Sequence, residues 1–143
     1  MSELDMNYKV WVENNMPHTV VYWRANDRRD ELNRQGERRQ LTLEDLSVIY
    51  SMCPKFLEEG VLYIKDKKVR EYFNLDYSKV IYFKELDKVL DLETEKLEKV
   101  IDRVSDTAKE QVANKAKAKG VDSKKKTKII EEKTGKKITK EEE

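Results

Sequence analysis

All twelve aromatic residues of this 143-residue chain lie between Tyr8 and Phe83, and residues 84–143 contain none. Aromatic side chains supply the largest single blocks of buried surface, so a packed core is easier to build in the first part of the chain than in the second. A chain of this length forms one domain, or one small domain with an appendage. We therefore expect a compact module over 8–83, a charged helical region over 84–138, and flexible tails at 1–7 and 139–143.

Charge is abundant in this chain but almost balanced. Charged residues make up 41% and hydrophobic residues 38%, with 30 Lys and Arg against 29 Asp and Glu. The balance holds in both parts, because residues 1–83 contain 13 basic and 14 acidic side chains and residues 84–143 contain 17 and 15. A dedicated nucleic-acid-binding protein typically has a net-basic footprint, which this composition lacks.

Three features predict the cellular compartment. The single cysteine, Cys53, excludes an intrachain disulfide and fits a reducing environment. The first ten residues have no apolar signal-peptide core. No stretch approaches the roughly 20 apolar residues that span a bilayer. We therefore expect a protein made and kept in the cytoplasm, unless an assembly carries it elsewhere.

The beginning of the module predicts two strands joined by a turn. The alternation of β-branched and aromatic residues over 8–12 is typical of a strand, and the pattern repeats over 19–24. Residues 14–17, with two asparagines and a proline, give a turn signal. The two strands are predicted to form a hairpin, with Trp11 and Trp23 packing across it.

The segment after residue 41 predicts a helix. Thr42 can cap it, and the acidic residues of its first turn suit the helix dipole. Pro54 ends or restarts this helix. Apolar side chains recur at helical spacing at Leu43, Leu46, Ile49 and Tyr50.

A third strand is predicted over 61–64, followed by a short helix that Asp66 caps and that turns Val69, Tyr72 and Phe73 inward. Together these elements predict an α+β protein. Its small β-rich N-terminal module contains short helices, and a C-terminal helical appendage follows.

From residue 84 onward the pattern is purely helical, and residues 79–83 are either a last strand or the lead-in to a helix. Thr94, Ser105, and either Asp122 or Ser123 can cap successive helices. Gly120 and Gly135 suit the helix ends. The apolar stripes of the four expected helices are Leu86, Val89 and Leu90; Leu97, Val100, Ile101 and Val104; Ala108, Val112 and Ala116; and Ile129 and Ile130.

The residue types that carry catalysis are sparse. His18 is the only histidine, and it follows a proline in a turn. Cys53 has no second cysteine, and the histidine lies in another element, so a buried structural thiol is favoured over a nucleophile. Four scattered glycines form no phosphate-binding loop. We expect no enzymatic activity, no metal site and no cofactor.

The arginine-rich stretch over 25–40 is predicted to be a mobile surface loop, with a return to β structure near Gln40 and Leu41. It has three interpretations: contact with nucleic acid, ordering against a neighbouring subunit, or a solvated loop whose charges cancel internally. Because aromatic residues and arginine are enriched at interface centres, we selected candidate partner-binding residues in and around it. They are Trp11, Tyr22, Trp23, Arg24, Arg28, Arg29, Arg34, Arg38 and Arg39.

A second charged feature is the run over 115–128, which carries seven lysines. Its order of helix, Gly-Val-Asp-Ser and lysine-rich helix resembles the helix-extended-helix hairpins of SAP and Rho N-terminal type, which bind nucleic acid. The resemblance rests on Gly120, Val121, Lys125 or Lys126, and the pair Ile129 and Ile130. A plain helical hairpin that meets partner proteins explains the run as well. The alternative nucleic-acid-binding residues are Lys117, Lys119, Lys124, Lys125, Lys126 and Lys128.

Two short runs carry a further resemblance. They are FLEEGVLYIKD at 56–66, followed by a short helix, and Val121-Asp122-Ser123 followed by IIEEKTGKKI at 129–138. With the short helices between them, they resemble a family of small structural proteins of tailed-bacteriophage virions, over roughly residues 8–138. The resemblance implies a non-enzymatic component associated with the head or the head–tail junction.

The same resemblance implies a decoration, vertex or neck position in the particle. The expected partners are other virion proteins, namely the major capsid, portal or neck proteins, bound in multiple copies. The expected location is the virion, with the host cytoplasm during assembly. The resemblance carries no catalytic residues onto this chain, and it does not include the arginine-rich stretch.

Overall fold

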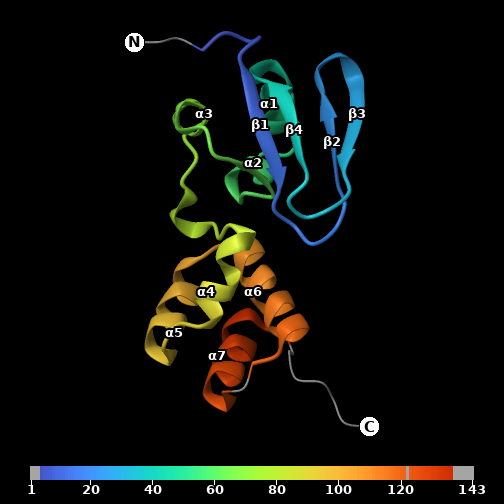
Figure 1. The fold of residues 1–143 in the computed structure, drawn as a ribbon. Helices are drawn as coiled ribbons and strands as arrows, with labels where there is room; N and C mark the ends of the chain where they lie inside the picture. The colour runs from blue at the N-terminus through green and yellow to red at the C-terminus, as the bar shows by residue number, and fades with distance from the viewer. Residues whose placement is uncertain (1–3, 122, 137–143) are drawn as a thin grey trace. The chain divides into compact units, whose positions relative to one another are not determined.

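The computed structural model describes residues 4–121 and 123–136, and the chain is an α+β protein as the sequence predicts (Figure 1). It divides into two compact units, Met1–Tyr77 and Ser78–Glu143. The sequence placed this boundary at residue 83. Ile81 is buried and Phe83 packs in the core of the second unit, so these two apolar residues belong with the helices that follow them.

The first unit contains two antiparallel sheets. One has three strands in the order β4-β1-β5, and the other has two strands, β2 and β3 (Figure 1). The strands are β1 (Lys9–Asn14), β2 (Val20–Arg24), β3 (Arg28–Leu32), β4 (Arg38–Thr42) and β5 (Leu62–Ile64).

The predicted hairpin of the first two strands is wrong. Strand β1 pairs with β4 and β5, whereas β2 pairs with β3, so Trp11 and Trp23 lie on different sheets. The physical reason is the buried side chain of Asn14. Its Nδ2 donates to the carbonyl oxygens of His18 at 2.9 Å and Leu32 at 3.1 Å. The bond to Leu32 connects the last residue of β1 to the last residue of β3.

The arginine-rich stretch is ordered structure rather than a loop. After the 3₁₀ turn η1 (Ala25–Asp27) it forms β3, a turn over 33–37 and β4. Asn26 and Asp27 have φ values of 65° and 57°, in the left-handed region that short polar side chains tolerate. The charged composition hid the strands, because several inward positions are filled by paired ionic groups instead of apolar side chains.

The helical segments of this unit are α1 (Leu43–Met52), α2 (Lys55–Glu58), α3 (Lys67–Tyr72) and the turn η2 (Tyr77–Lys79). The predicted cap of α1 is confirmed: Thr42 Oγ1 accepts from the Asp45 amide at 3.1 Å, and Asp45 accepts from the Thr42 amide at 3.0 Å. Asp66 caps α3 as predicted. Tyr72 was expected to point inward, but it is half exposed, because this short helix buries only the side that carries Val69.

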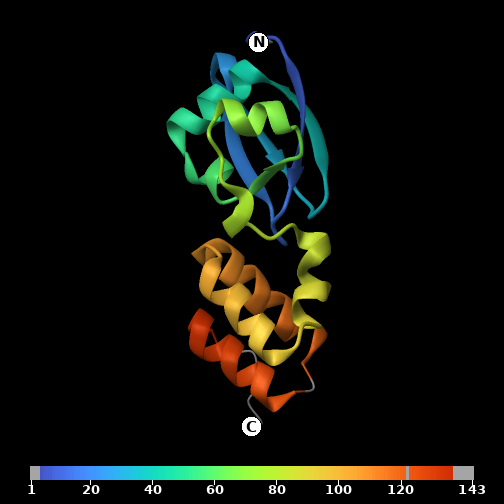
Figure 2. The same cartoon turned by 90° about the vertical axis from the view of Figure 1, so that its left-hand side faces the viewer.

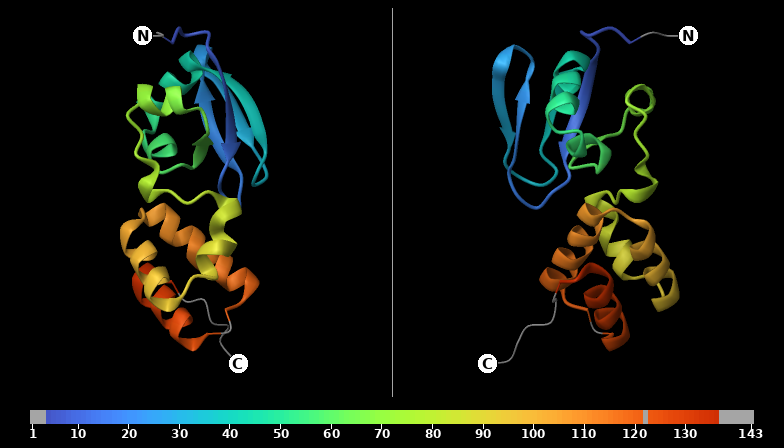
Figure 3. Two further views of the ribbon diagram at one scale, coloured as in Figure 1. Left: turned by 60° about the vertical axis from the view of Figure 1, so that its left-hand side comes forward. Right: turned by 180° about the vertical axis from the view of Figure 1, so that it is seen from behind.

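One continuous core holds the first unit together. Val10 and Val12 project from β1 toward Leu46 and Ile49 of α1, and all four side chains are buried. Figure 3 (left) shows the helical segments on one side of β1 and β4. The opposite face of that sheet is open to solvent around Trp11, Arg38 and Gln40, whereas Glu13 on the same face is buried.

The second unit is helical over its described residues (Figure 2). Its core contains the predicted apolar stripes, with Leu97, Ile101, Val112 and Ile130 fully buried. Residues 79–83 form no strand and lead into the helices, and Ser105 and Ser123 cap as expected, whereas Asp122 lies outside the described residues. The elements are the turn η3 (Phe83–Glu85), α4 (Leu86–Leu90), α5 (Thr94–Arg103), α6 (Asp106–Lys119) and α7 (Lys124–Thr134).

Because each unit has its own core, we predict that the two unfold separately. Both tryptophans lie in the first unit, so tryptophan fluorescence reports on that unit, whereas far-ultraviolet circular dichroism is dominated by the helices of the second. In urea the two probes should give different midpoints. Coincident midpoints and slopes would show instead that the chain unfolds as one cooperative body.

Candidate interaction site

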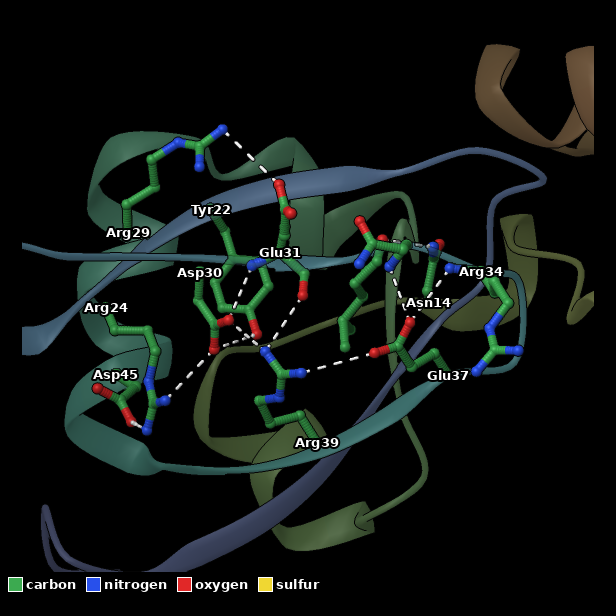
Figure 4. Close-up of polar contacts among 12 residues, drawn as sticks. Asn14, Tyr22, Arg24, Arg29, Asp30, Glu31, Arg34, Glu37, Arg39 and Asp45 are labelled. Atoms are coloured by element: carbon green, nitrogen blue, oxygen red, sulfur yellow. Dashed lines mark hydrogen bonds and ion pairs between the residues drawn. The ribbon is translucent and has the colours of Figure 1, made fainter.

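The carboxylate of Asp30 is the centre of a polar network in the first unit (Figure 4). Its Oδ1 accepts from Arg39 Nη1 and from the Glu31 amide at 2.8 Å. Its Oδ2 accepts from Arg24 Nη1 at 3.3 Å and from the Tyr22 hydroxyl at 3.1 Å. Both oxygens of this one carboxylate are therefore fully engaged.

The network extends from Asp30 to the neighbouring elements. Arg24 Nη2 donates to Asp45 Oδ2 at 3.1 Å, and the Ala25 amide donates to Asp45 Oδ1 at 3.0 Å. Arg39 also donates to the carbonyl oxygen of Glu31 at 3.1 Å. These bonds connect the β2–β3 hairpin to the start of α1 and to β4.

The ionisation states favour this arrangement. Burial by itself raises the pKa of the Asp30 carboxyl, but hydrogen bonds from Arg39, the Glu31 amide and Tyr22 outweigh burial and hold that pKa below its ordinary value. Burial, together with the nearby Asp30 charge, raises the pKa of Tyr22 to about 12. Asp30 is therefore an acceptor and Tyr22 a donor at neutral pH.

This network corrects part of the predicted partner-binding set. Tyr22 is only 2% exposed, so its side chain is not on the surface. The side chains of Arg24 and Arg39 are 17% and 33% exposed, and both are occupied by internal carboxylates. For these two arginines the internal cancellation of charge is the interpretation that applies. The remaining arginines of the set are exposed: Arg28, Arg29, Arg34 and Arg38.

Trp11 and Arg38 lie together on the outer face of the three-stranded sheet. Trp11 is 57% exposed, and the Arg38 guanidinium carbon lies 5.6 Å from the centroid of its ring. The strand register places both side chains on the face opposite to Val10 and Leu41. An exposed tryptophan held by a cation–π contact is a pre-positioned surface group.

A second exposed aromatic group lies on the outer face of the β2–β3 hairpin. Trp23 is 42% exposed and Val21 is 36% exposed. Their cross-strand partners are Arg29 and Glu31, whose side chains form an exposed ion pair at 3.7 Å. Each sheet thus presents one tryptophan with an arginine to solvent, which is the composition found at the centres of protein interfaces.

A third cluster of this kind was not predicted. The Arg70 guanidinium carbon lies 4.2 Å from the Tyr77 ring centroid and 5.3 Å from that of Tyr63. Arg70 Nε donates to the carbonyl oxygen of Ile64 at 2.6 Å, and the Ile64 amide donates to the Tyr77 hydroxyl at 3.1 Å. Burial raises the pKa of Tyr77 to about 12. No spacing in the sequence signals this cluster, because it joins three separate elements.

The predicted lysine set, like the arginine set, contains some residues with contacts inside the unit and others without them. Lys119 Nζ lies 3.5 Å from Asp87 and 3.7 Å from Asp91, and Lys126 Nζ donates to the carbonyl oxygen of Leu90 at 3.0 Å. Both lysines thus contact acceptors within the second unit, although the side chain of Lys119 is still 42% exposed. The other members of the set are exposed: Lys117, Lys124, Lys125 and Lys128.

The two catalytic candidates belong to different elements. His18 is exposed and its Nδ1 lies 3.0 Å from the Thr19 carbonyl oxygen, whereas the half-buried Cys53 follows α1. Residues 4–121 and 123–136 contain no group of three or more His, Cys, Asp or Glu side chains positioned to hold a metal ion. The absence of an enzymatic activity and of a cofactor remains a prediction.

Comparisons with known proteins give no relative for this chain: no family model, no curated protein and no solved structure matches it. Among the helices in the described part of the chain, none is long and apolar enough to cross a membrane. The resemblance to phage virion proteins therefore stands on the sequence motifs alone.

We predict that Asp30→Asn destabilises the first unit by about 2 kcal/mol at pH 7, because it removes the charge that pairs Arg24 and Arg39 while leaving both cations in place. The folded pKa of Asp30 is lowered, so its contribution is complete above the unfolded value of about 3.9 and is lost as the pH falls through the folded value. The difference from wild type should therefore shrink toward pH 2. Urea unfolding followed by tryptophan fluorescence measures it.

Asp27→Asn is the matched control. Asp27 lies in the same hairpin and is exposed, and asparagine tolerates its positive φ equally well. This variant should leave the stability within about 0.5 kcal/mol of wild type. Equal losses in the two variants would show that the Asp30 network does not stabilise the unit.

Proposed function

We propose that the protein is a non-enzymatic structural component of a tailed-bacteriophage particle, which binds other virion proteins through its N-terminal unit. The observation that carries this proposal is the exposed pair of Trp11 and Arg38 on the open face of the three-stranded sheet. A buried tryptophan contributes more to an interface than almost any other side chain. Trp11 is exposed and is therefore accessible to a partner protein.

The organisation of the first unit supports docking rather than catalysis. Its inner arginines form ion pairs with Asp30 and Asp45 inside the unit. The strand register places Trp11 and Trp23 on the outer faces of the two sheets. A rigid surface loses little conformational freedom on binding, which favours stable assembly. The expected partners are the major capsid, portal or neck proteins, bound in many copies in the virion after assembly in the host cytoplasm.

The first test of the proposal is the protein composition of purified phage particles. Purified particles assembled from the genome that encodes this chain should contain it in a fixed ratio to the major capsid protein, as measured by quantitative mass spectrometry. The isolated protein should also bind such particles when DNA is present as a competitor. Absence from the particles, or association that DNA abolishes, would reject a structural role in the virion.

Trp11→Ala should weaken binding to these particles at least tenfold, because truncation of an interface tryptophan typically costs 2 kcal/mol or more, on the order of 30-fold in affinity. The fold should be unaffected, since more than half of this side chain is already exposed. Binding is measured by co-sedimentation of the labelled protein with particles that lack it.

Met52→Ala is the control for this experiment. Met52 is 62% exposed and is the last residue of α1, so it belongs to neither sheet. Its truncation removes exposed apolar surface without touching the sheet faces. If both variants bind like wild type, the outer face of the three-stranded sheet is not the docking surface.

The second candidate function is binding of nucleic acid by the C-terminal hairpin, favoured by the exposed lysines of α7. Lys124, Lys125 and Lys128 lie within one side of this helix at spacings of three and four residues. Lysine–phosphate contacts release counterions, so such binding falls steeply with salt. Replacing these three residues by Gln should reduce the slope of log K against log salt by about two to three for duplex DNA, measured by fluorescence anisotropy.

The control removes the same charge from another helix. Lys96, Lys99 and Arg103 lie along one exposed side of α5, and their replacement by Gln should leave the slope unchanged. An equal reduction in both variants would indicate only a general loss of positive charge. A flat response of the wild-type protein between low and moderate salt would exclude this function.

A further inference from the structure

A charged hollow lies at the end of the β2–β3 hairpin. Its volume is about 290 Å³, and it is lined by Arg24, Arg28, Arg29, Asp30 and Arg39. Four arginines and one carboxylate thus line it, and of the four Arg24 and Arg39 form ion pairs with Asp30. The volume corresponds to about ten water molecules, at about 30 Å³ each, which is enough room for a side-chain-sized group.

The carboxylate in the hollow does not neutralise all four cations. Both oxygens of Asp30 are already engaged by Arg24, Arg39, the Glu31 amide and Tyr22. Arg29 has only an exposed, long contact to Glu31, in which the side chains are 57% and 42% exposed. Exposed pairs of this kind contribute little.

Arg28 is the least satisfied of the four cations. No carboxylate in the described part of the chain forms an ion pair with it, and its direct cross-strand partner is another cation, Arg24. Like charges opposite one another in an antiparallel pair are destabilising. In addition, Arg24 Nε is buried without a hydrogen-bond acceptor among the described residues. An anion beside these groups would relieve the repulsion and supply acceptors.

The net charge of the first unit and the apolar surface beside the hollow indicate which kind of anion it binds. Residues 1–77 contain 12 Lys and Arg against 14 Asp and Glu, so the hollow is a local positive site on a net-acidic unit. A polyanion such as nucleic acid needs an extended basic surface. One carboxylate needs only the paired donors of an arginine fork. Trp23 is the cross-strand partner of Arg29, so apolar surface lies directly beside the cations.

We propose that the hollow lined by Arg24, Arg28, Arg29 and Arg39 binds the carboxylate of an acidic side chain, presented by a partner protein whose apolar neighbouring residues cover Trp23. This inference rests on the proposed function, because it specifies the chemistry by which a neighbouring subunit would be recognised. Arg24 and Arg39 shape the site and are held by internal carboxylates. Arg28, and Arg29 with its exposed pair to Glu31, supply the donors for the partner.

The test uses the full chain and a short acidic peptide, acetyl-Leu-Glu-Glu-Leu-amide, at constant ionic strength. Binding is followed by nuclear magnetic resonance through the Nε–H signals of Arg28 and Arg29. The peptide should shift both signals in a saturable manner. Arg28→Gln should weaken binding roughly tenfold, the effect of losing one charge-assisted hydrogen bond. Lys55→Gln, which removes an exposed cation on α2, should not change it.

Three comparison ligands make the outcome decisive. Equal binding of acetyl-Leu-Gln-Gln-Leu-amide would show that apolar contact alone is measured and would overturn the proposal. Tighter binding of inorganic phosphate, or of a ten-residue oligothymidine, would overturn it in favour of a phosphate-bearing ligand. The absence of any saturable shift would overturn it as well.

The experiment also separates this inference from the proposed function. If the protein is present in particles but the peptide does not bind, the carboxylate site is wrong and the structural role stands. If the peptide binds as expected but the protein is absent from particles, the site stands and the partner belongs to another assembly. Arg28 is exposed, so loss of folding does not confound its variant, and the amide spectrum of the protein verifies this.

Discussion

The N-terminal unit depends on the pairing of Asp30 with two arginines. Neither sheet of this unit is large, and the two sheets share no backbone pairing in the described residues. Asp30 receives Arg24 from its own hairpin and Arg39 from the three-stranded sheet, and Arg24 continues to Asp45 at the start of α1. The same carboxylate, Asp45, also closes the cap of α1. Charge therefore connects elements that also share one apolar core.

This use of arginine inside the unit has a consequence for its surface. Arginines that hold the fold are unavailable to partners, so the arginine-rich stretch is not one recognition loop. It is divided into an inner set and an outer set by the alternation of β3 and β4. The outer set lies next to Trp11 and Trp23, and these neighbours give two sheet faces the composition of an interface.

The sequence predicted those elements whose signals are local. The cap at Thr42, the cap at Asp66 and the helical stripes of the second unit are visible within a few residues, and the structure confirms them. Strand pairing is not a local property, so the hairpin of β1 and β2 was wrong. Strand β3 was missed because Asp30 occupies an inward position where the alternation pattern requires an apolar residue. The predicted return to β structure near Gln40 and Leu41 is confirmed by β4.

Both units place charge where it opposes local stability. Arg24 lies opposite Arg28 in an antiparallel pair, and the first turn of α7 contains Lys124, Lys125 and Lys126 but no acidic residue. Cations at a helix N-terminus oppose the helix dipole, at a cost of about 0.3–1 kcal/mol each. Of these three lysines, Lys126 alone has an internal acceptor among the described residues, the carbonyl oxygen of Leu90. The exposed cations at these two places are open to an anionic group, and the hollow on β2–β3, where we propose such binding, has more arginine donors than the start of α7.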